Sequence, residues 1–445
     1  MGILLDAIYA AGLVATSPVW TYRMIRHGRY RQRVGQRFGA VPVRHSRQPA
    51  IWVHGVSLGE VNAARTLVQK LHSQLPDFQV VISSTTDTGM AAAQRRYAPE
   101  HLVFQWPLDF TLSVRKALDR IRPSLVVLME GEAWPNFLAA CNARKIPTAV
   151  VNGRLSADKG YPRYRKLGPL AARLFNRLSA VCVQDDSYAR RFRELGIAPE
   201  KIRVTGMMKF DTAEVADRID GQDELAAALG IDDDQQLLVA GGTGPGEEQM
   251  LLEIFNRLRK EHPEIRLAIV PRKPERFEEV ARLIKQSGLA FLRRSERPDG
   301  TEDDAGAASV ILGDTMGELR KFYALASVCF VGRSLVPMGG SDMIEAAALG
   351  RPTVFGRHTY NFPQAGELAE NGCVQVDGPV ELAEQIERWL ADPPAAAEAG
   401  KRAQQAVIER QGATRRNVEV LCGLLGRQPA RRPGGIATDR VEAEQ

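Results

Sequence analysis

Residues 51–71 read IWVHGVSLGEVNAARTLVQKL and combine two hydrophobic rhythms in one short stretch. The apolar run into Val53 is typical of a buried strand, and the later part has the spacing of an amphipathic helix. Small and polar residues separate the two parts, as in the turn of a strand–helix unit. The stretch therefore predicts one βα unit of a parallel sheet, with Glu60 where the turn ends.

The same alternation of short apolar runs and longer amphipathic ones continues along the chain in two series. The first starts at about residue 50 and the second after about residue 220, with a polar, acidic stretch between them. Alternating strands and helices indicate βαβ units, and 445 residues exceed what one hydrophobic core usually serves. We therefore predict an α/β chain with two doubly wound, Rossmann-like domains facing a cleft, in which ligands bind at the carboxyl ends of the strands. The expected strands read AIWVHG, FQVVISS, LVVLME, PTAVVN, AVCVQ and KIRVTG, then QLLVAGG, IRLAIVP, SVILGD, SVCFVG and PTVFG.

Cysteine usage and missing motifs argue against several classes of protein. The five cysteines are scattered and lack CxxC spacing, which indicates a reducing compartment and argues against a thiolate metal site. No GxGxxG follows the first strand and no GxxxxGKS/T occurs, which disfavours nicotinamide dehydrogenases and P-loop proteins. We expect no metal, no organic cofactor and no nucleic-acid partner.

The amino-terminal end combines an apolar run with a cluster of arginines. Residues 3–20, ILLDAIYAAGLVATSPVW, are interrupted by Asp6 and Pro18 and fall short of the ~20 clean apolar residues of a spanning helix. The positive charges follow this run, whereas in a secretory signal they precede it. We expect residues 1–48 to form a membrane-associating helix and basic segment that docks on an anionic bilayer surface. A helix packed on the body with solvated arginines is the alternative. The arginines are Arg23, Arg26, Arg29, Arg31, Arg33 and Arg37.

Glu60 has two interpretations. Ser57 and Glu60 have the spacing of a capping box, in which the serine bonds the third helical amide and the glutamate reaches back to the cap. That role alone explains Glu60. The same carboxylate, however, follows the first strand's carboxyl end, beside His54 and Gly55, where the cleft is expected. A helix N-terminus favours the ionised form that a general base requires, so both interpretations stay open.

Charged residues also follow two later strands of the first series. Glu130 and Glu132 come at the end of the strand in LVVLMEGEAWPN, and Arg154 follows the strand in VVNGRLS. An internal salt bridge is one explanation, and a polar acceptor pocket is the other. The paired glutamates favour the pocket. The loop SSTTDTG, residues 83–89, is placed similarly, although hydroxyl-rich loops often only cap helices.

In the second series, glycine-rich turns precede two helices. AGGTGPGEEQ, residues 240–249, offers backbone amides and a helix N-terminus to an anion. SLVPMGGSDMIEAAALG, residues 334–350, repeats the arrangement, with Glu345 in about the first turn of its helix. Together the two turns fit a nucleotide that is bound without a P-loop lysine. IVPRKPERF, residues 269–277, adds cationic side chains at another strand end, where ordinary surface charge is the alternative.

Taken in order, these motifs resemble those of the 3-deoxy-D-manno-octulosonic acid (Kdo) transferases over roughly residues 1–425. The resemblance implies a GT-B fold and an inverting glycosyltransferase. Such an enzyme moves Kdo from CMP-Kdo to a lipid A precursor (lipid IVA) in lipopolysaccharide biosynthesis, at the cytoplasmic face of the inner membrane. A related GT-B transferase with another nucleotide sugar or lipid acceptor is the alternative, as is a non-catalytic, membrane-docked binding homologue. The motifs are HGVSLGE, TTDTG, PLDF, MEGEAWPN, NGRLS, VTGMMKFD, GTGPGEE, VPRKPERF, DTMGEL, FVGRSLVPMGGSDMIEAA and PTVFG.

The resemblance also implies roles for single residues. Glu60 matches the family's catalytic base, Glu130 the acidic position of its acceptor pocket, and Arg154 the arginine of its NxRxS stretch. We expect the acceptor domain at residues 49–212, the donor domain at 213–426, and a disordered tail at 427–445. The expected donor-binding residues are Pro271, Arg272, Met316, Gly317, Glu318, Gly340 and Glu345. The chain departs from the family's usual residues at Met207, Gly244, Lys273, Ser341 and Asp342.

Overall fold

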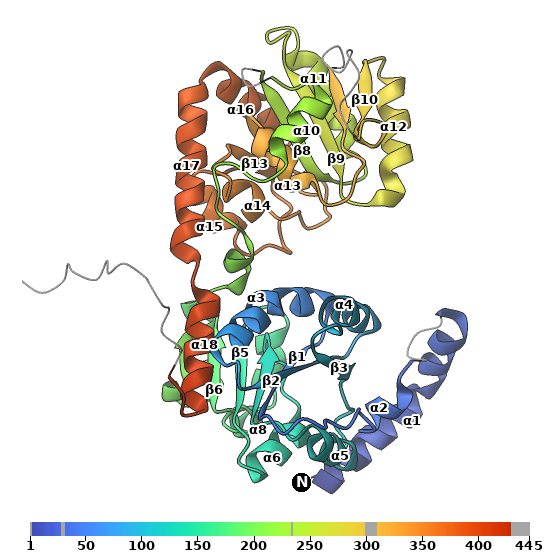
Figure 1. The fold of residues 1–445 in the computed structure, drawn as a ribbon, viewed down its shortest axis with the longest axis vertical. Coiled ribbons are helices and arrows are strands. Elements are labelled where there is room, and N and C mark those ends of the chain that lie inside the picture. The colour runs from blue at the N-terminus through green and yellow to red at the C-terminus, as the bar shows by residue number, and fades with distance from the viewer. Residues whose placement is uncertain (1, 28–31, 233–234, 299–308, 429–445) are drawn as a thin grey trace, which may run out of the picture. The chain divides into compact units, whose positions relative to one another are not determined.

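The computed structural model describes residues 2–27, 32–232, 235–298 and 309–428 (Figure 1). These residues form two compact units, which are described one at a time. The first unit contains residues 1–212 and 411–445, and the second contains residues 213–410. The tail expected at 427–445 lies almost wholly outside the described residues.

The first unit is built on a seven-stranded parallel sheet with strand order β3-β2-β1-β4-β5-β6-β7. The chain leaves β1 for β2 on one side and returns to β4 on the other, so the switch point of the sheet lies between β1 and β4. The strands are β1 (Ala50–Gly55), β2 (Gln79–Ser84), β3 (Leu102–Gln105), β4 (Leu125–Met129), β5 (Thr148–Gly153), β6 (Ala180–Val183) and β7 (Ile202–Val204).

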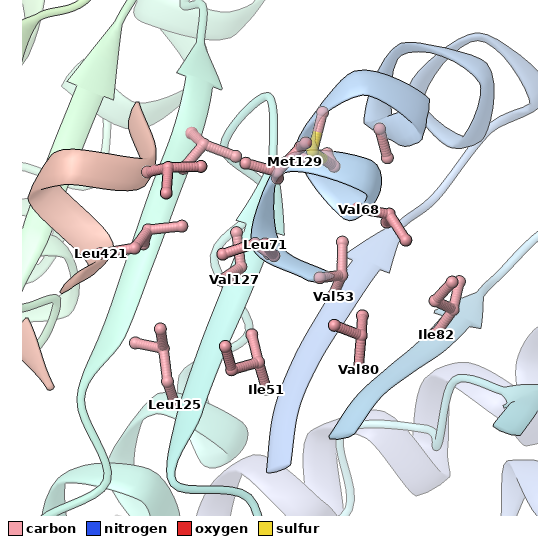
Figure 2. Packing of buried hydrophobic residues seen from close by; sticks show 14 of the residues in the cluster. Ile51, Val53, Val68, Leu71, Val80, Ile82, Leu125, Val127, Met129 and Leu421 are labelled. Atoms are coloured by element: carbon pink, nitrogen blue, oxygen red, sulfur yellow. The ribbon is translucent and has the colours of Figure 1, made fainter. Parts of the chain in front are cut away.

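Helices cover both faces of this sheet. One face packs against α3, α4 and α18, and Figure 2 shows Val68 and Leu71 of α3 beside Ile51, Val53 and Val127 of the strands. The other face packs against α5, α6, α8 and α9. The helices are α3 (Leu58–Gln74), α4 (Asp87–Tyr97), α5 (Thr111–Ile121), α6 (Pro135–Ala143), α7 (Gly160–Arg165), α8 (Pro169–Phe175), α9 (Asp186–Glu194) and α18 (Ala413–Leu424).

Residues 411–426, predicted to belong to the donor domain, lie in the first unit instead, so this boundary was wrong. Helix α18 belongs to the first unit, because Val418, Leu421 and Cys422 are buried in the first sheet's core. The Asp211 carboxylate also accepts a bond from the Gly412 N–H at 2.6 Å, which fastens the start of this returning segment.

The second unit repeats the architecture with strand order β10-β11-β9-β8-β12-β13-β14, all parallel. Its switch point lies between β8 and β12. The strands are β8 (Leu237–Thr243), β9 (Arg266–Pro271), β10 (Phe291–Arg293), β11 (Val310–Leu312), β12 (Val328–Val331), β13 (Thr353–Gly356) and β14 (Val374–Val376). The helices are α10 (Gln222–Leu229), α11 (Glu247–Leu258), α12 (Phe277–Gln286), α13 (Leu319–Leu325), α14 (Ile344–Ala347), α15 (Ala365–Glu370), α16 (Pro379–Ala391) and α17 (Pro393–Arg410). Two doubly wound parallel sheets confirm the predicted α/β class.

The amino-terminal apolar run forms one helix, α1 (Gly2–His27), and a short helix α2 (Val34–Arg37) follows. By length and composition, Gly2–Arg26 could cross a membrane. Asp6, which interrupts the apolar run, faces the body: its Oδ1 accepts bonds from the Thr111 N–H at 3.0 Å and the Asn136 side-chain amide at 2.9 Å. Tyr9 also donates to Asp109 at 3.3 Å. The first part of α1 is therefore fastened to the unit by polar contacts.

Candidate functional site

Glu60 lies in the first turn of α3, directly after the carboxyl end of β1. Ser57 caps the helix, since its Oγ accepts the Glu60 N–H at 3.4 Å and donates to Glu60 Oε1 at 2.8 Å. The other carboxylate oxygen, Oε2, accepts the Val56 N–H at 2.9 Å. The expected reciprocal cap is thus present, and it fixes both oxygens of the carboxylate.

The protonation of Glu60 is set by competing effects. The residue is 8 % exposed, and this burial raises the pKa of its carboxyl above the usual range. Hydrogen bonds from Val56 and Ser57, together with the Arg154 charge, lower the same pKa and so offset part of the effect. A carboxylate with a raised pKa that still accepts directed bonds is suited to taking up a proton.

Glu130 and Arg154 meet in the loops that follow β4 and β5. Arg154 Nε lies 2.9 Å from Glu130 Oε2, and the Arg154 N–H donates to the Glu130 carbonyl at 3.0 Å. Burial raises the pKa of Glu130 to about 6; the Arg154 charge lowers it and the Glu60 charge raises it. The salt bridge expected as one explanation exists, and it lies close enough to Glu60 for the charges to interact. The loops after β1 and β4 flank the sheet's switch point and the loop after β5 is next to them, so the three residues share one region.

Glu132 is the third acidic residue of this region, together with Glu60 and Glu130. Burial raises its pKa, the Glu60 charge adds to the rise, and the Arg163 charge lowers it. Arg163 belongs to α7, and the sequence analysis did not single it out. The only signal was a cationic stretch shortly after the NGRLS motif, which is too general to assign a role.

His54, which neighbours this region in sequence, has a structural role. It is 1 % exposed, and its ring stacks on Trp106 with a centroid separation of 3.8 Å. Its Nδ1 lies 2.9 Å from Ser83 Oγ. Burial lowers the pKa of His54 to about 3, so the ring is neutral and packs as part of the core.

In the second unit, the charges of three residues singled out from the sequence act on one buried phenol. Tyr323 on α13 has a pKa raised by burial; the charges of Glu345 and Asp342 raise it further, and that of Arg272 lowers it. Arg272 follows β9, while Asp342 and Glu345 lie at the start of α14. The charges of Arg272 and Glu345 therefore both act on Tyr323. Asp342 Oδ1 accepts the Ile344 N–H at 3.2 Å, so this carboxylate, at which the chain departs from the family, bonds the first backbone amide of α14.

The other expected donor-side residues occupy the neighbouring loops. Pro271 ends β9 and is buried, whereas Met316 and Gly317 are exposed in the loop before α13. Gly340 has a φ of +86°, and an added Cβ would lie 3.2 Å from the Phe362 ring. Glu318 is bound by Arg294 at 3.0 and 3.1 Å, and although burial alone raises its pKa, the bonds from Arg294 and Thr315 hold it below its usual value.

The glycine-rich turn before α11 already holds an internal anion. Glu247 is fully buried, and its carboxylate accepts four backbone amides. Only one of these amides, that of Gly244, belongs to the turn at residues 240–249. All four are engaged by Glu247, so they are not available to an external anion of the kind predicted for this turn. Similarly, Arg276 of the IVPRKPERF motif pairs with the buried Glu248. The four amides belong to Gly244, Arg333, Ser334 and Leu335, at 2.9, 2.5, 2.8 and 3.0 Å.

Within the described residues, no group of three or more His, Cys, Asp or Glu side chains is arranged to hold a metal ion.

Known proteins share both the sequence and the fold. Residues 32–212 match the family described as 3-Deoxy-D-manno-octulosonic-acid transferase (kdotransferase). The 3-deoxy-D-manno-octulosonic acid transferase of Haemophilus influenzae is 31% identical over 410 residues, covering 91% of this chain and 94% of that protein. The Bordetella pertussis transferase of the same name is 33% identical over 440 residues, covering 94% and 99%. A glycosyltransferase structure from Rickettsia africae ESF-5 aligns with a TM-score of 0.57 and 13% identity, over 85% of this chain and 99% of that one. At 13% identity, the similarity to the Rickettsia structure shows only a shared fold, which is GT-B.

Proposed function

Because the chain belongs to the 3-deoxy-D-manno-octulosonic acid (Kdo) transferase family, we propose that it transfers Kdo from CMP-Kdo to a lipid A precursor with inversion, using Glu60 as the general base. The chain is a glycosyltransferase by family and fold. What we propose beyond this is the identity of the donor and of the acceptor, inversion at the anomeric carbon, and the role of Glu60 as the base.

The observation that carries the proposal is the constraint on Glu60. A hydroxyl and a backbone amide hold its two oxygens at 2.8 and 2.9 Å, at the carboxyl edge of a doubly wound sheet. A carboxylate has about four lone-pair sites, so at least one remains for an acceptor hydroxyl. The nearby Glu130–Arg154 pair supplies the polar groups that bind a sugar hydroxyl and turn it toward the base.

In the proposed reaction, Glu60 removes the proton from an acceptor sugar hydroxyl while that oxygen attacks the anomeric carbon of Kdo. The new carbon–oxygen bond forms as the bond to the CMP phosphate breaks, and CMP leaves with the bonding electrons. The proton then passes from Glu60 to water. Single displacement from the opposite face inverts the anomeric centre.

Donor binding is assigned to the second unit. CMP and the Kdo carboxylate are both anionic, so the donor requires cations. Arg272 meets this requirement at the carboxyl end of β9, and its charge and that of Glu345 both act on Tyr323. In the proposal, Arg272 contacts the phosphate and Glu345 accepts ribose hydroxyls. Pro271, Met316, Gly317, Glu318 and Gly340 border the same nucleotide.

The acceptor's location follows from its chemistry. A lipid A precursor is acylated and remains in a bilayer, so the enzyme must work at a membrane surface. We assign it to the cytoplasmic face of the inner membrane, with α1 as the attachment element. The exposed apolar side chains of α1 support this assignment: Ile3, Leu4, Ile8, Leu13, Val14 and Val19.

The test is acceptor-dependent release of CMP. Purified full-length protein is incubated with CMP-Kdo in the presence and absence of detergent-dispersed lipid IVA, and the lipid product is analysed by mass. We expect CMP release to require the lipid and one or more Kdo units to appear on it. Lipid-dependent turnover of another nucleotide sugar, with none of CMP-Kdo, would replace the donor assignment. CMP-Kdo binding without turnover would favour a non-catalytic homologue.

A further inference from the structure

A groove of about 400 Å³ lies between the first turns of α1, the start of α5 and the whole of α6. None of Glu60, Glu130 and Arg154 lines it, so it is separate from the site described above. Its walls are formed largely by small or apolar side chains of α1 and α6. These side chains are Leu5, Pro135, Ala139, Ala140 and Ala143.

Three guanidinium groups line the same groove: Arg115, Arg144 and Arg177. Arg144 pairs with Asp119 at 2.8 Å, and because the Asp119 side chain is 66% exposed, this surface pair is weak. Arg177 donates to the Pro135 carbonyl at 3.1 Å, which holds it beside the wall of the groove.

Asp6, on the helix that contributes Gly2 and Leu5 to the groove, is already engaged. Asp6 of α1 accepts bonds from the Thr111 N–H and the Asn136 side chain, and these bonds fasten α1 alongside the groove. The groove therefore combines apolar walls with an excess of positive charge.

The surface next to the groove is also apolar. Ile3, Leu4 and Ile8 on α1 are 86%, 68% and 56% exposed, and Leu112 on α5 is 76% exposed. Clusters of exposed apolar side chains on a soluble unit mark an interaction surface. Here the exposed apolar side chains lie near the arginines of the groove. A surface that combines apolar side chains with cations binds anionic bilayers.

We propose that this groove binds one molecule of anionic phospholipid from the membrane, with an acyl chain along the alanine face of α6 and the phosphate against Arg115, Arg144 and Arg177. The small side chains of α6 leave room for a linear chain. A soluble anion does not explain the apolar walls, and a neutral lipid does not explain the three guanidinium groups. The proposal rests on the membrane association in the proposed function and goes beyond it, because it predicts a stoichiometric lipid rather than diffuse attraction.

The experiment measures retained lipid. Full-length protein is incubated with vesicles of phosphatidylglycerol and phosphatidylcholine, re-isolated in mild detergent, and examined by native mass spectrometry. We expect one phosphatidylglycerol per chain and no retained phosphatidylcholine. Excess inorganic phosphate should not displace the lipid, because it cannot replace the acyl contacts.

Matched variants test the geometry. Arg115→Ala should lower retention about tenfold, whereas Lys116→Ala, which removes the same charge one residue along α5 but outside the groove, should leave it unchanged. Ala143→Trp should block the groove, whereas Asn142→Trp adds the same ring to a neighbouring exposed position outside it. All four positions are exposed, so the folded core is not altered.

Several outcomes would overturn the proposal. Equal losses in Arg115→Ala and Lys116→Ala would mean diffuse electrostatics, and equal retention of both lipids would mean unspecific apolar filling. Displacement by phosphate would mean a simple anion site. Transfer of Kdo to dispersed lipid IVA is measured in the same preparations. A wild-type protein that transfers Kdo but retains no phospholipid refutes only the groove, whereas one that transfers none refutes the proposed function.

Discussion

Arg154 and Glu130 are joined twice, by an ion pair of 2.9 Å between Nε and Oε2 and by a backbone bond of 3.0 Å from the Arg154 N–H to the Glu130 carbonyl. Glu130 adopts a φ of 59° to make this possible, a left-handed conformation that is uncommon outside glycine. The two loops after β4 and β5 are thereby held as one element beside Glu60. The pKa of Glu60 therefore depends on the charges of this pair.

Replacing Glu130 with Gln should move the acid limb of the pH–rate profile to lower pH. A base must be ionised to act, so kcat/KM falls as pH decreases through the raised pKa of Glu60. Removing the neighbouring negative charge, and freeing Arg154, favours the ionised form and lowers that pKa. The measurement is kcat/KM for transfer between about pH 4 and 8. The exposed Glu200→Gln is the control. A midpoint that stays fixed in Glu130→Gln would show that Glu60 does not govern the acid limb.

Replacing Glu247 with Gln should destabilise the second unit by about 2–4 kcal/mol. The carboxylate accepts four buried backbone amides, and an amide side chain has only one accepting atom, so donors are left unsatisfied at about 1–3 kcal/mol each. The measurement is urea unfolding. Glu253→Gln, on the same helix but exposed, should change stability by less than about 0.5 kcal/mol. Similar stabilities for both variants would contradict the anchoring role.

Replacing Arg272 or Glu345 with Ala should weaken CMP binding by about tenfold or more, since hydrogen bonds to charged groups contribute about 1.5–3 kcal/mol. Isothermal titration with CMP measures this affinity, and binding of the lipid acceptor should be unaffected. Arg282→Ala and Glu370→Ala remove like charges from exposed positions and serve as controls. Unchanged CMP affinity in both test variants would place the donor elsewhere.

Placing charge on the outer face of α1 should detach the protein from anionic vesicles. Ile8 and Val14 are 56% and 73% exposed, so Ile8→Glu together with Val14→Glu leaves the fold intact but opposes both apolar insertion and anionic lipid. Vesicle flotation measures the bound fraction. Val380→Glu, at a 63% exposed position on α16, is the control. Undiminished flotation of the α1 variant would show that α1 is not the attachment element.

The sheet architecture could be predicted because its signals are local. The apolar run into Val53, the turn and the helical spacing after it specify a βα unit without tertiary information, and Ser57 and Glu60 are close enough in sequence for their cap to be recognised. The partner of a returning helix is not a local property. The apolar face of α18 fits a βα core in either unit, and only the completed first sheet determines that Leu421 packs there.

The same limit applies to the charged residues. Glu247 follows a glycine-rich turn, which predicts an anion site, but three of its four amides come from residues 333–335, far along the chain. The sequence therefore indicated an anion at this turn without revealing that the chain supplies it. Asp6 is similar, because its partners Thr111 and Asn136 are brought to α1 only by the fold.

The final prediction separates the two roles of Glu60 with two substitutions. In Glu60→Gln, the side-chain carbonyl can still accept the Val56 N–H and the NH₂ group can donate to Ser57 Oγ, so the cap survives while proton uptake is lost. Transfer should fall by about two to four orders of magnitude with little change in Tm or CMP affinity. Ser57→Ala should do the reverse, costing about 0.5–2 kcal/mol of stability while leaving the base in place and most of the transfer rate intact. A Gln variant that turns over at nearly the wild-type rate would leave Glu60 with its helix-capping role alone, since capping is the one function that both side chains share.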